Sequence, residues 1–254
     1  MDFLNNILQL PHRCLLNKKI TKAFFKRNFD LSIAERSLLD TQIENIDWIA
    51  SLNPENINVN TYVNEDLIYE EIQVIAVIIR DKDFENIAIK VAELIHKYIP
   101  YAILLCVYDT QQMVWSTYHK RIHQNDFSKR MIDKRYFSEA ISLSVKSSLQ
   151  SKFLESLAYQ HLEKANLFEL YNGYTQRIFA LQASKLNSTF TVRTQSRTQS
   201  DMLLLEELNK LQEEIDGLSN TAKKETQLNK QVDLNLQIQH KRTAMAQLKL
   251  KIAE

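Results

Sequence analysis

The chain has 254 residues, 44% of them hydrophobic, and its formal net charge at pH 7 is +1. A chain of this length and composition can bury a substantial core, so disorder is excluded as its default state. Only two glycines occur, Gly173 and Gly217, and no glycine-rich turn could hold a phosphate with its bare backbone. This excludes Walker-type nucleotide hydrolysis and Rossmann-type dinucleotide binding.

The first predicted elements are a helix and a strand. Ser32 and Glu35 have the spacing of a capping box, and the apolar residues that follow them recur near helical spacing as far as Trp48. We expect this helix to end before Pro54, because the residue that precedes a proline avoids the helical region. Residues 56–63, including Asn58, alternate polar and β-branched side chains, which predicts a strand with one solvated face.

The central part of the chain predicts a crossover between buried strands. Residues 71–79 and 102–108 are almost continuously apolar, which indicates strands buried on both faces. Between them, residues 84–98 repeat apolar side chains every three or four positions, which predicts an amphipathic helix that Pro100 stops. Residues 113–118 complete a β-β-α-β-β order in which the helix is a right-handed crossover joining parallel strands.

The remaining sequence is predicted to be helical. Helical spacing returns over residues 149–186, where Gly173 could break the helix, and these helices are expected to cover the other face of the sheet. Residues 187–200 are rich in Ser, Thr, Gln and Arg and are predicted to be a linker. We therefore expect a mixed α+β fold, with a small mixed sheet flanked by helices in residues 1–186 and a helical arm in residues 201–254.

The arm has the heptad spacing of a coiled coil. We predict that its apolar positions form a partner interface, and these are Leu204, Leu208, Leu211, Ile215, Leu218, Ile238, Met245, Leu248 and Ile252. The two halves are out of phase, and Gly217 with the next residues could end one helix. A helical hairpin and one continuous helix are both open, and so are a monomer and an oligomer formed through the arm.

The cysteine spacing and the N-terminal sequence show neither a disulfide framework nor a targeting signal. Cys14 and Cys106 lie far apart, and no CxxC metal motif occurs. The N-terminus lacks a basic start followed by an apolar stretch, and no apolar run reaches the roughly 18 residues that span a bilayer. We expect a cytoplasmic protein without membrane contact. Among the histidines, His96 is expected at the surface of the crossover helix, and no metal site is predicted from the histidines.

Acidic residues at the start of the buried strand give one candidate site. Asp66, Glu70 and Glu71 lie close together in sequence, and Gln73 follows two residues later. Restriction-endonuclease-like folds use an acidic residue and a Glu-x-Lys pair, in which carboxylates hold Mg²⁺ and the lysine steadies the attacking water. Gln73 takes the place of that lysine and cannot supply its charge. A degenerate, Mg²⁺-dependent nuclease site is therefore the alternative to a solvated acidic strand end.

Basic residues form two clusters with interleaved aromatic side chains. No Lys or Arg occurs from Ser37 to Ile79, so these clusters flank an acidic block. They suit nucleic-acid phosphates and stacked bases, and a solvated face or an acidic protein partner explains them as well. The candidate nucleic-acid-binding residues are Arg13, Lys18, Lys19, Lys22, Lys26, Arg27, Lys120, Arg121, Lys129 and Arg130.

Three stretches of the chain resemble a bacterial family, the domain of unknown function 4391. They are residues 17–22 with Phe25, residues 46–58 running on to residues 71–74, and residues 224–235 in the arm. The resemblance implies no activity, but it implies an accessory protein encoded beside helicases and DNA methyltransferases in restriction or anti-phage clusters. The last stretch also places Asn229 and Asn235 where the apolar seam is interrupted, either as buried register-setting residues or as an exposed polar turn.

Two functions follow from these patterns and the resemblance. The first is a non-catalytic subunit of an antiviral defence complex that docks on a helicase or another nucleic-acid enzyme and associates through its coiled-coil arm. It needs no cofactor, and its partners are the helicase or methyltransferase of the same gene cluster, with DNA contact as a further option. The second is a divalent-metal nuclease that uses Glu71 with Asp66 or Glu70.

Overall fold

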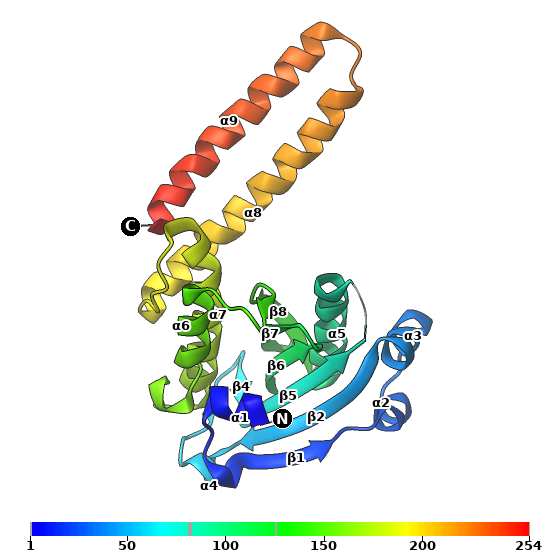
Figure 1. The fold of residues 1–254 in the computed structure, drawn as a ribbon, viewed down its shortest axis with the longest axis vertical. Helices are drawn as coiled ribbons and strands as arrows, with labels where there is room; N and C mark the ends of the chain where they lie inside the picture. The colour runs from blue at the N-terminus through cyan, green and yellow to red at the C-terminus, as the bar shows by residue number, and fades with distance from the viewer. Residues whose placement is uncertain (1, 81–82, 125, 254) are drawn as a thin grey trace. The chain divides into compact units, whose positions relative to one another are not determined.

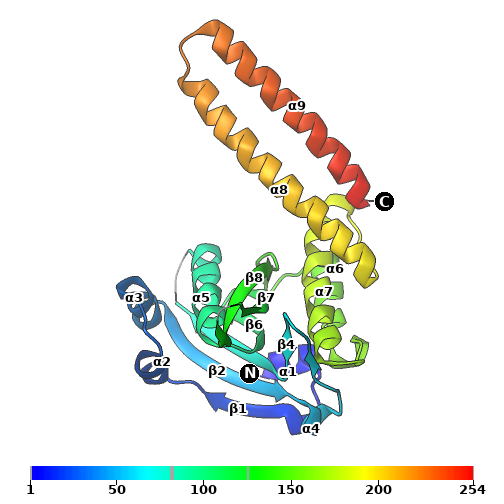
Figure 2. The same ribbon diagram turned by 180° about the vertical axis from the view of Figure 1, so that it is seen from behind.

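The computed structural model describes residues 2–80, 83–124 and 126–253. The chain divides into two compact units, Met1–Gln182 and Ala183–Glu254. The first unit is a mixed α+β domain and the second is helical (Figures 1 and 2). The fold class predicted from the sequence, a mixed sheet with helices followed by a helical arm, is confirmed.

The first unit contains a mixed sheet whose strand order is β1-β2-β5-β6-β7-β8, with β9 paired to β7. The pairing of β5 with β6 is parallel, as expected for strands joined by a crossover helix, and the other pairings are antiparallel. These strands are β1 (Leu15–Lys19), β2 (Ile43–Leu52), β5 (Ile72–Ile79), β6 (Ala102–Tyr108), β7 (Gln112–His123), β8 (Asp126–Phe137) and β9 (Ile141–Ser142).

Helices and short elements complete the first unit. The α-helices are α1 (Asp2–Leu8), α2 (Lys22–Asn28), α3 (Ile33–Thr41), α4 (Pro54–Ile57), α5 (Phe84–Tyr98), α6 (Ser148–Ser156) and α7 (Leu167–Asn187), of which α7 runs on past Gln182 into the second unit. Two 3₁₀ turns, η1 (His12–Cys14) and η2 (Tyr159–His161), and a separate hairpin of β3 (Tyr62–Val63) with β4 (Ile68–Tyr69) make up the rest.

Helix α5 packs on one face of the sheet through the apolar stripe that its sequence predicts. Val91, Leu94 and Ile95 of α5 are buried in one core cluster with alternate residues of β5 and β6, among them Val77 and Leu105. Alternate residues share a face because the side-chain period of a strand is two. The helix ends at Tyr98, directly before Ile99 and Pro100, so the predicted stop is confirmed.

The opposite face of the sheet is covered by α1 and α7. Phe3 of α1 contacts Tyr108 of β6 with ring centroids 5.2 Å apart. Tyr171 of α7 is fully buried, and its hydroxyl lies 3.0 Å from the carbonyl oxygens of Ile103 and Tyr118 and accepts a hydrogen bond from the Tyr118 amide. Helix α7 is continuous through Gly173, so the break considered there does not occur.

The predicted helix from Ser32 to Trp48 is half right. Its capping box is present, since Glu35 accepts from the Ser32 amide and Ser32 accepts from the Glu35 amide. The helix ends at Thr41, however, and the following apolar segment is strand β2. Bulges in the pairing of β2 with β5 shift the register, and most of β2 is buried on both faces. Both effects blur the alternation by which a strand is recognised.

The predicted strand over residues 56–63 is wrong except at its end. Asn53 and Asn56 exchange side-chain to backbone hydrogen bonds and cap the short helix α4, with Pro54 in its first turn. Asn58 adopts the left-handed conformation that ends α4, and only Tyr62–Val63 are extended in a strand. An asparagine followed by proline is a helix-start signal that the alternating pattern obscured.

The second unit is a helical hairpin made of α8 (Gln195–Lys224) and α9 (Leu228–Ala253). The open choice between a hairpin and one continuous helix is thus decided for the hairpin, and its turn lies at residues 225–227 rather than near Gly217. Since α8 begins at Gln195, the last part of the predicted linker 187–200 is helical. Asn229 and Asn235 are exposed, as in the polar-turn alternative. In the described part of the chain, no helix is long and apolar enough to cross a membrane.

Candidate functional site

Glu71 and Gln73 belong to a hydrogen-bonded row that crosses β2 and β5. The Gln73 side chain accepts from the Trp48 indole N–H at 2.7 Å and donates to Glu71 Oε2 at 2.7 Å. Ser51 also donates to Glu71 Oε2 at 3.3 Å. The register of the two strands causes this meeting, because Ser51 pairs with Gln73. Both ends of the Gln73 amide are therefore occupied by protein groups in the position that a nuclease lysine would take.

The other two acidic candidates lie outside this row. Asp66 is in the turn between β3 and β4, where its amide donates to Asn64, and Glu70 follows β4; both are exposed. Among the described residues, no group of three or more His, Cys, Asp or Glu side chains is placed to hold a metal ion. What the structure shows at Glu71 is a polar network that ties β2 to β5.

The N-terminal basic cluster is divided between structural and exposed side chains. Lys22 donates to the carbonyl oxygens of Asp40 at 3.1 Å and Ile43 at 2.5 Å, and Lys26 pairs with the Asp40 carboxylate at 2.7 Å. These two lysines fasten α2 to the end of α3. Lys26 is nevertheless exposed, and so are the remaining members, Arg13, Lys18, Lys19 and Arg27.

The basic cluster on the β7–β8 hairpin is also partly structural. Lys120 is buried and donates to the carbonyl oxygens of Ile99 and Tyr101. Burial, with a smaller effect of the Arg130 charge, lowers the pKa of Lys120 to about 7. Arg121 pairs with Asp133 at 3.0 Å, Lys129 pairs with Asp126 at 3.1 Å, and Arg130 donates to the Lys129 carbonyl oxygen.

The two basic clusters are not brought together. One lies on β1 and α2 and the other on β7 and β8, so they flank opposite edges of the sheet. Five strand spacings separate β1 from β8 in the strand order, a path of roughly 24 Å. The fold therefore gives two separate basic surfaces, and nucleic-acid contact by either cluster stays a prediction.

His96 of α5 belongs to a buried polar cluster with Ser116 and Tyr118 of β7. His96 is buried, which corrects the expectation that it lies at the surface of the crossover helix; its Nε2 lies 3.2 Å from Ser116 Oγ, and its ring stacks on Tyr118 at 3.9 Å. Burial and then the Lys120 charge lower the pKa of His96 well below its usual value. Burial also lowers the pKa of His119, near Thr175, to about 4. Helical spacing alone could have signalled the burial of His96, because it lies four residues after Ala92 on the buried side of α5.

The seam residues of the arm are brought together, but by the hairpin itself. Ile215 of α8 and Met245 of α9 are 4% and 7% exposed, and they belong to one core cluster. The other buried members are Leu208, Ile238, Leu248 and Ile252, and the partly buried members include Leu204, Leu211 and Leu218. Six of the predicted interface residues are thus already covered within the chain.

Ion pairs fasten the base of the hairpin. Asp201, almost fully buried, lies 2.9 Å from Arg193 Nη1 and 3.1 Å from Arg197 Nε. Arg197 also donates to the Lys251 carbonyl oxygen at 2.9 Å, so it links the start of α8 to the end of α9. Lys241 and Glu214 form a further pair between the helices at 2.5 Å.

The fold and these sites define a mixed α+β protein that combines a seven-stranded sheet with a two-helix hairpin. The chain belongs to the family described as Domain of unknown function (DUF4391), whose model matches residues 8–245. No curated protein and no solved structure matches it.

Proposed function

We propose that the protein is a non-catalytic accessory subunit of a bacterial restriction or anti-phage defence complex, which docks on a helicase or another nucleic-acid enzyme and associates with it through the hairpin. The observation that carries the proposal is the hairpin, a separate compact unit with its own apolar seam. A two-helix hairpin buries one stripe of each helix and leaves the other faces for further helices. The gene context implied by the family resemblance supports the choice of partner.

The exposed basic residues support docking near nucleic acid. Arg13, Lys18, Lys19 and Arg27 form a solvent-exposed cationic edge around β1 and α2. Such an edge attracts either an acidic surface of the enzyme or the phosphates of its substrate. Lys22 is left out of this edge because it donates to backbone carbonyl oxygens, and the charge of the exposed Lys26 is already paired with Asp40.

Co-purification tests the proposal. The tagged full-length chain is co-expressed with the products of its neighbouring genes, and the eluted material is measured by light scattering. We expect a stable complex with a helicase or methyltransferase subunit, weakened in Lys18→Glu/Lys19→Glu and unchanged in Lys129→Glu, whose site is on the other edge. A wild-type chain that elutes alone would overturn the proposal.

A cleavage assay separates the proposal from the nuclease alternative. The purified chain, alone and with its co-purified partners, is incubated with plasmid and single-stranded DNA in Mg²⁺ or Mn²⁺. The accessory role predicts no cleavage that depends on Glu71. Metal-dependent cleavage that Glu71→Ala abolishes, while the variant keeps its fold, would replace the accessory role by the nuclease.

A further inference from the structure

Helix α9 carries a second stripe without charges that the hairpin does not use. Six of its residues alternate in steps of four and three, and all six are exposed: Val232, Leu236, Gln239, Thr243, Ala246 and Leu250. We call them the outer stripe. The large aliphatic members are 50%, 55% and 66% exposed at Val232, Leu236 and Leu250. Steps of four and three are the spacing at which a helix packs along another helix.

The outer stripe is on the far side of α9 from the seam. Leu236 and Leu250 are each two residues from a seam residue, Ile238 and Leu248, which is about 200° around the helix axis. The equivalent positions on α8 are different. Glu213 and Asn220 lie two residues from the α8 seam positions Ile215 and Leu218, and both are exposed and polar. The described α8 positions that correspond to Leu236 and Leu250 are therefore polar, whereas those of α9 are apolar.

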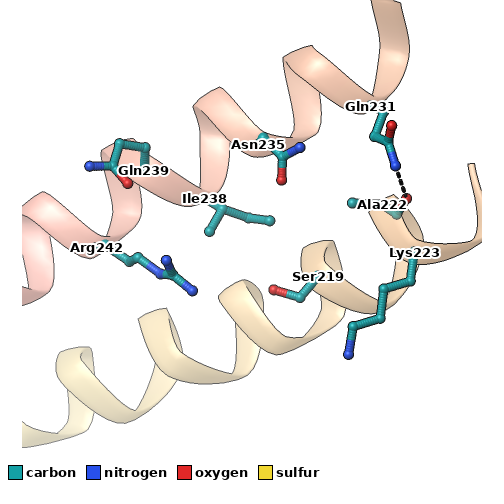
Figure 3. A pocket seen from close by; sticks show the side chains of 8 residues that line it. All are labelled: Ser219, Ala222, Lys223, Gln231, Asn235, Ile238, Gln239 and Arg242. Atoms are coloured by element: carbon teal, nitrogen blue, oxygen red, sulfur yellow. Dashed lines mark hydrogen bonds between the residues drawn. The ribbon is translucent and has the colours of Figure 1, made fainter. Parts of the chain in front are cut away.

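Grooves run beside the outer stripe. One has a volume of about 370 Å³ and is lined by Ser219 of α8 and by Asn235, Gln239 and Arg242 of α9, among others. Figure 3 shows Ile238 and the Arg242 side chain between the two helices at this groove. A second groove of about 310 Å³ shares Ser219 and Arg242, and its lining also includes Ala246 and Lys249 of α9 and Asp216 of α8. Side chains of an added helix could enter these grooves while that helix covers the outer stripe.

The charge that α9 itself places beside the outer stripe is net positive, with Asp216 of α8 as an acidic residue in the same groove. Helix α9 has five basic residues, Lys230, Lys241, Arg242, Lys249 and Lys251, and one acidic residue, Asp233. Lys241 pairs with Glu214 of α8, whereas Arg242 and Lys249 are exposed next to the stripe and line the grooves. A second copy of α9 would bring like charges together, which disfavours self-association. An acidic helix complements this face.

We propose that the outer stripe of α9 is the docking site for an amphipathic helix of a partner protein, one with an apolar heptad stripe flanked by Glu and Asp residues. The docked helix forms a third helix on the hairpin, with its apolar stripe on Val232, Leu236 and Leu250 and its carboxylates near Arg242 and Lys249. This inference deepens the proposed function and rests on it for the existence of a partner.

The test uses two synthetic amphipathic peptides with the same leucine heptads, one flanked by Glu and one by Lys, and the full-length protein. Fluorescence anisotropy measures their binding. We expect the Glu peptide to bind at least about tenfold more tightly than the Lys peptide. Leu236→Gln/Leu250→Gln should weaken the Glu peptide by at least about tenfold, whereas Leu203→Gln, an exposed leucine of α8, should not. Arg242→Glu/Lys249→Glu should reverse the preference between the peptides.

Several outcomes would overturn the inference. They are equal binding of both peptides, no binding of either, or binding insensitive to the outer-stripe variant. Sedimentation of the protein alone detects the other occupant: a dimer that Leu236→Gln/Leu250→Gln dissociates would show that a second copy covers the stripe. Native partners that co-purify undiminished with this variant would refute the docking site and leave the accessory role standing, whereas a wild-type chain without partners would refute the accessory role instead.

Discussion

Lys120 gives the most quantitative prediction, because its burial couples stability to pH. Its pKa falls from 10.5 in the unfolded chain to about 7 in the folded protein. Between these values the unfolded state binds more protons than the folded state, so stability rises with pH. For one such group the free energy of unfolding should increase by about 2 kcal/mol from pH 7 to pH 9, since one pKa unit corresponds to about 1.4 kcal/mol.

The substitution Lys120→Met removes this titration and keeps a side chain of similar length. Urea unfolding of wild type and variant at pH 6 to 9 measures the difference in their free energies of unfolding, in which the titrations of Tyr and Cys residues common to both proteins cancel. We expect the free energy of unfolding of the wild type to increase relative to that of Lys120→Met as the pH rises from 6 to 9. Lys129→Met, at an exposed position of the same hairpin, is the control and should leave the pH dependence unaltered. Parallel pH curves for wild type and Lys120→Met would refute the reasoning.

Three further substitutions test other parts of the structure. Burial alone would raise the pKa of Glu35, but hydrogen bonds from Lys97, Ser32 and Tyr98 lower it to about 2, so its contribution to stability is lost as the pH falls from 4.5 towards 2. In Glu35→Gln the free energy of unfolding should therefore fall less steeply with decreasing pH over that range, and a pH dependence equal to that of the wild type would count against this role of Glu35. Ile215→Ala in the seam should lower the free energy of unfolding by about 2–4 kcal/mol and make the helical circular-dichroism signal disappear at a lower temperature; an unchanged melting curve would contradict the burial of Ile215. Gln73→Leu should cost about 1–3 kcal/mol and shift tryptophan emission, because the Trp48 indole loses its acceptor; unaltered stability would contradict the network.

The sequence by itself determined the elements whose signals are local. The capping box at Ser32, the apolar period of α5 and the stop at Pro100 act within a few residues of chain, and the structure contains all three. The continuous apolar runs of β5 and β6 likewise required burial on both faces. The heptads of the arm required helices that bury a stripe.

Only the tertiary structure decided which surfaces remain available. Strand β2 is a strand because its neighbours pair with it. Bulges in that pairing interrupt the alternation of apolar and polar residues by which a strand is recognised in a sequence. Lys22 and Lys120 resemble binding residues in sequence but donate to backbone carbonyl groups that the fold brings near them. When α9 folds back on α8, the seam residues of the two helices bury one another and are no longer available to a partner. The outer stripe of α9 then faces away from α8.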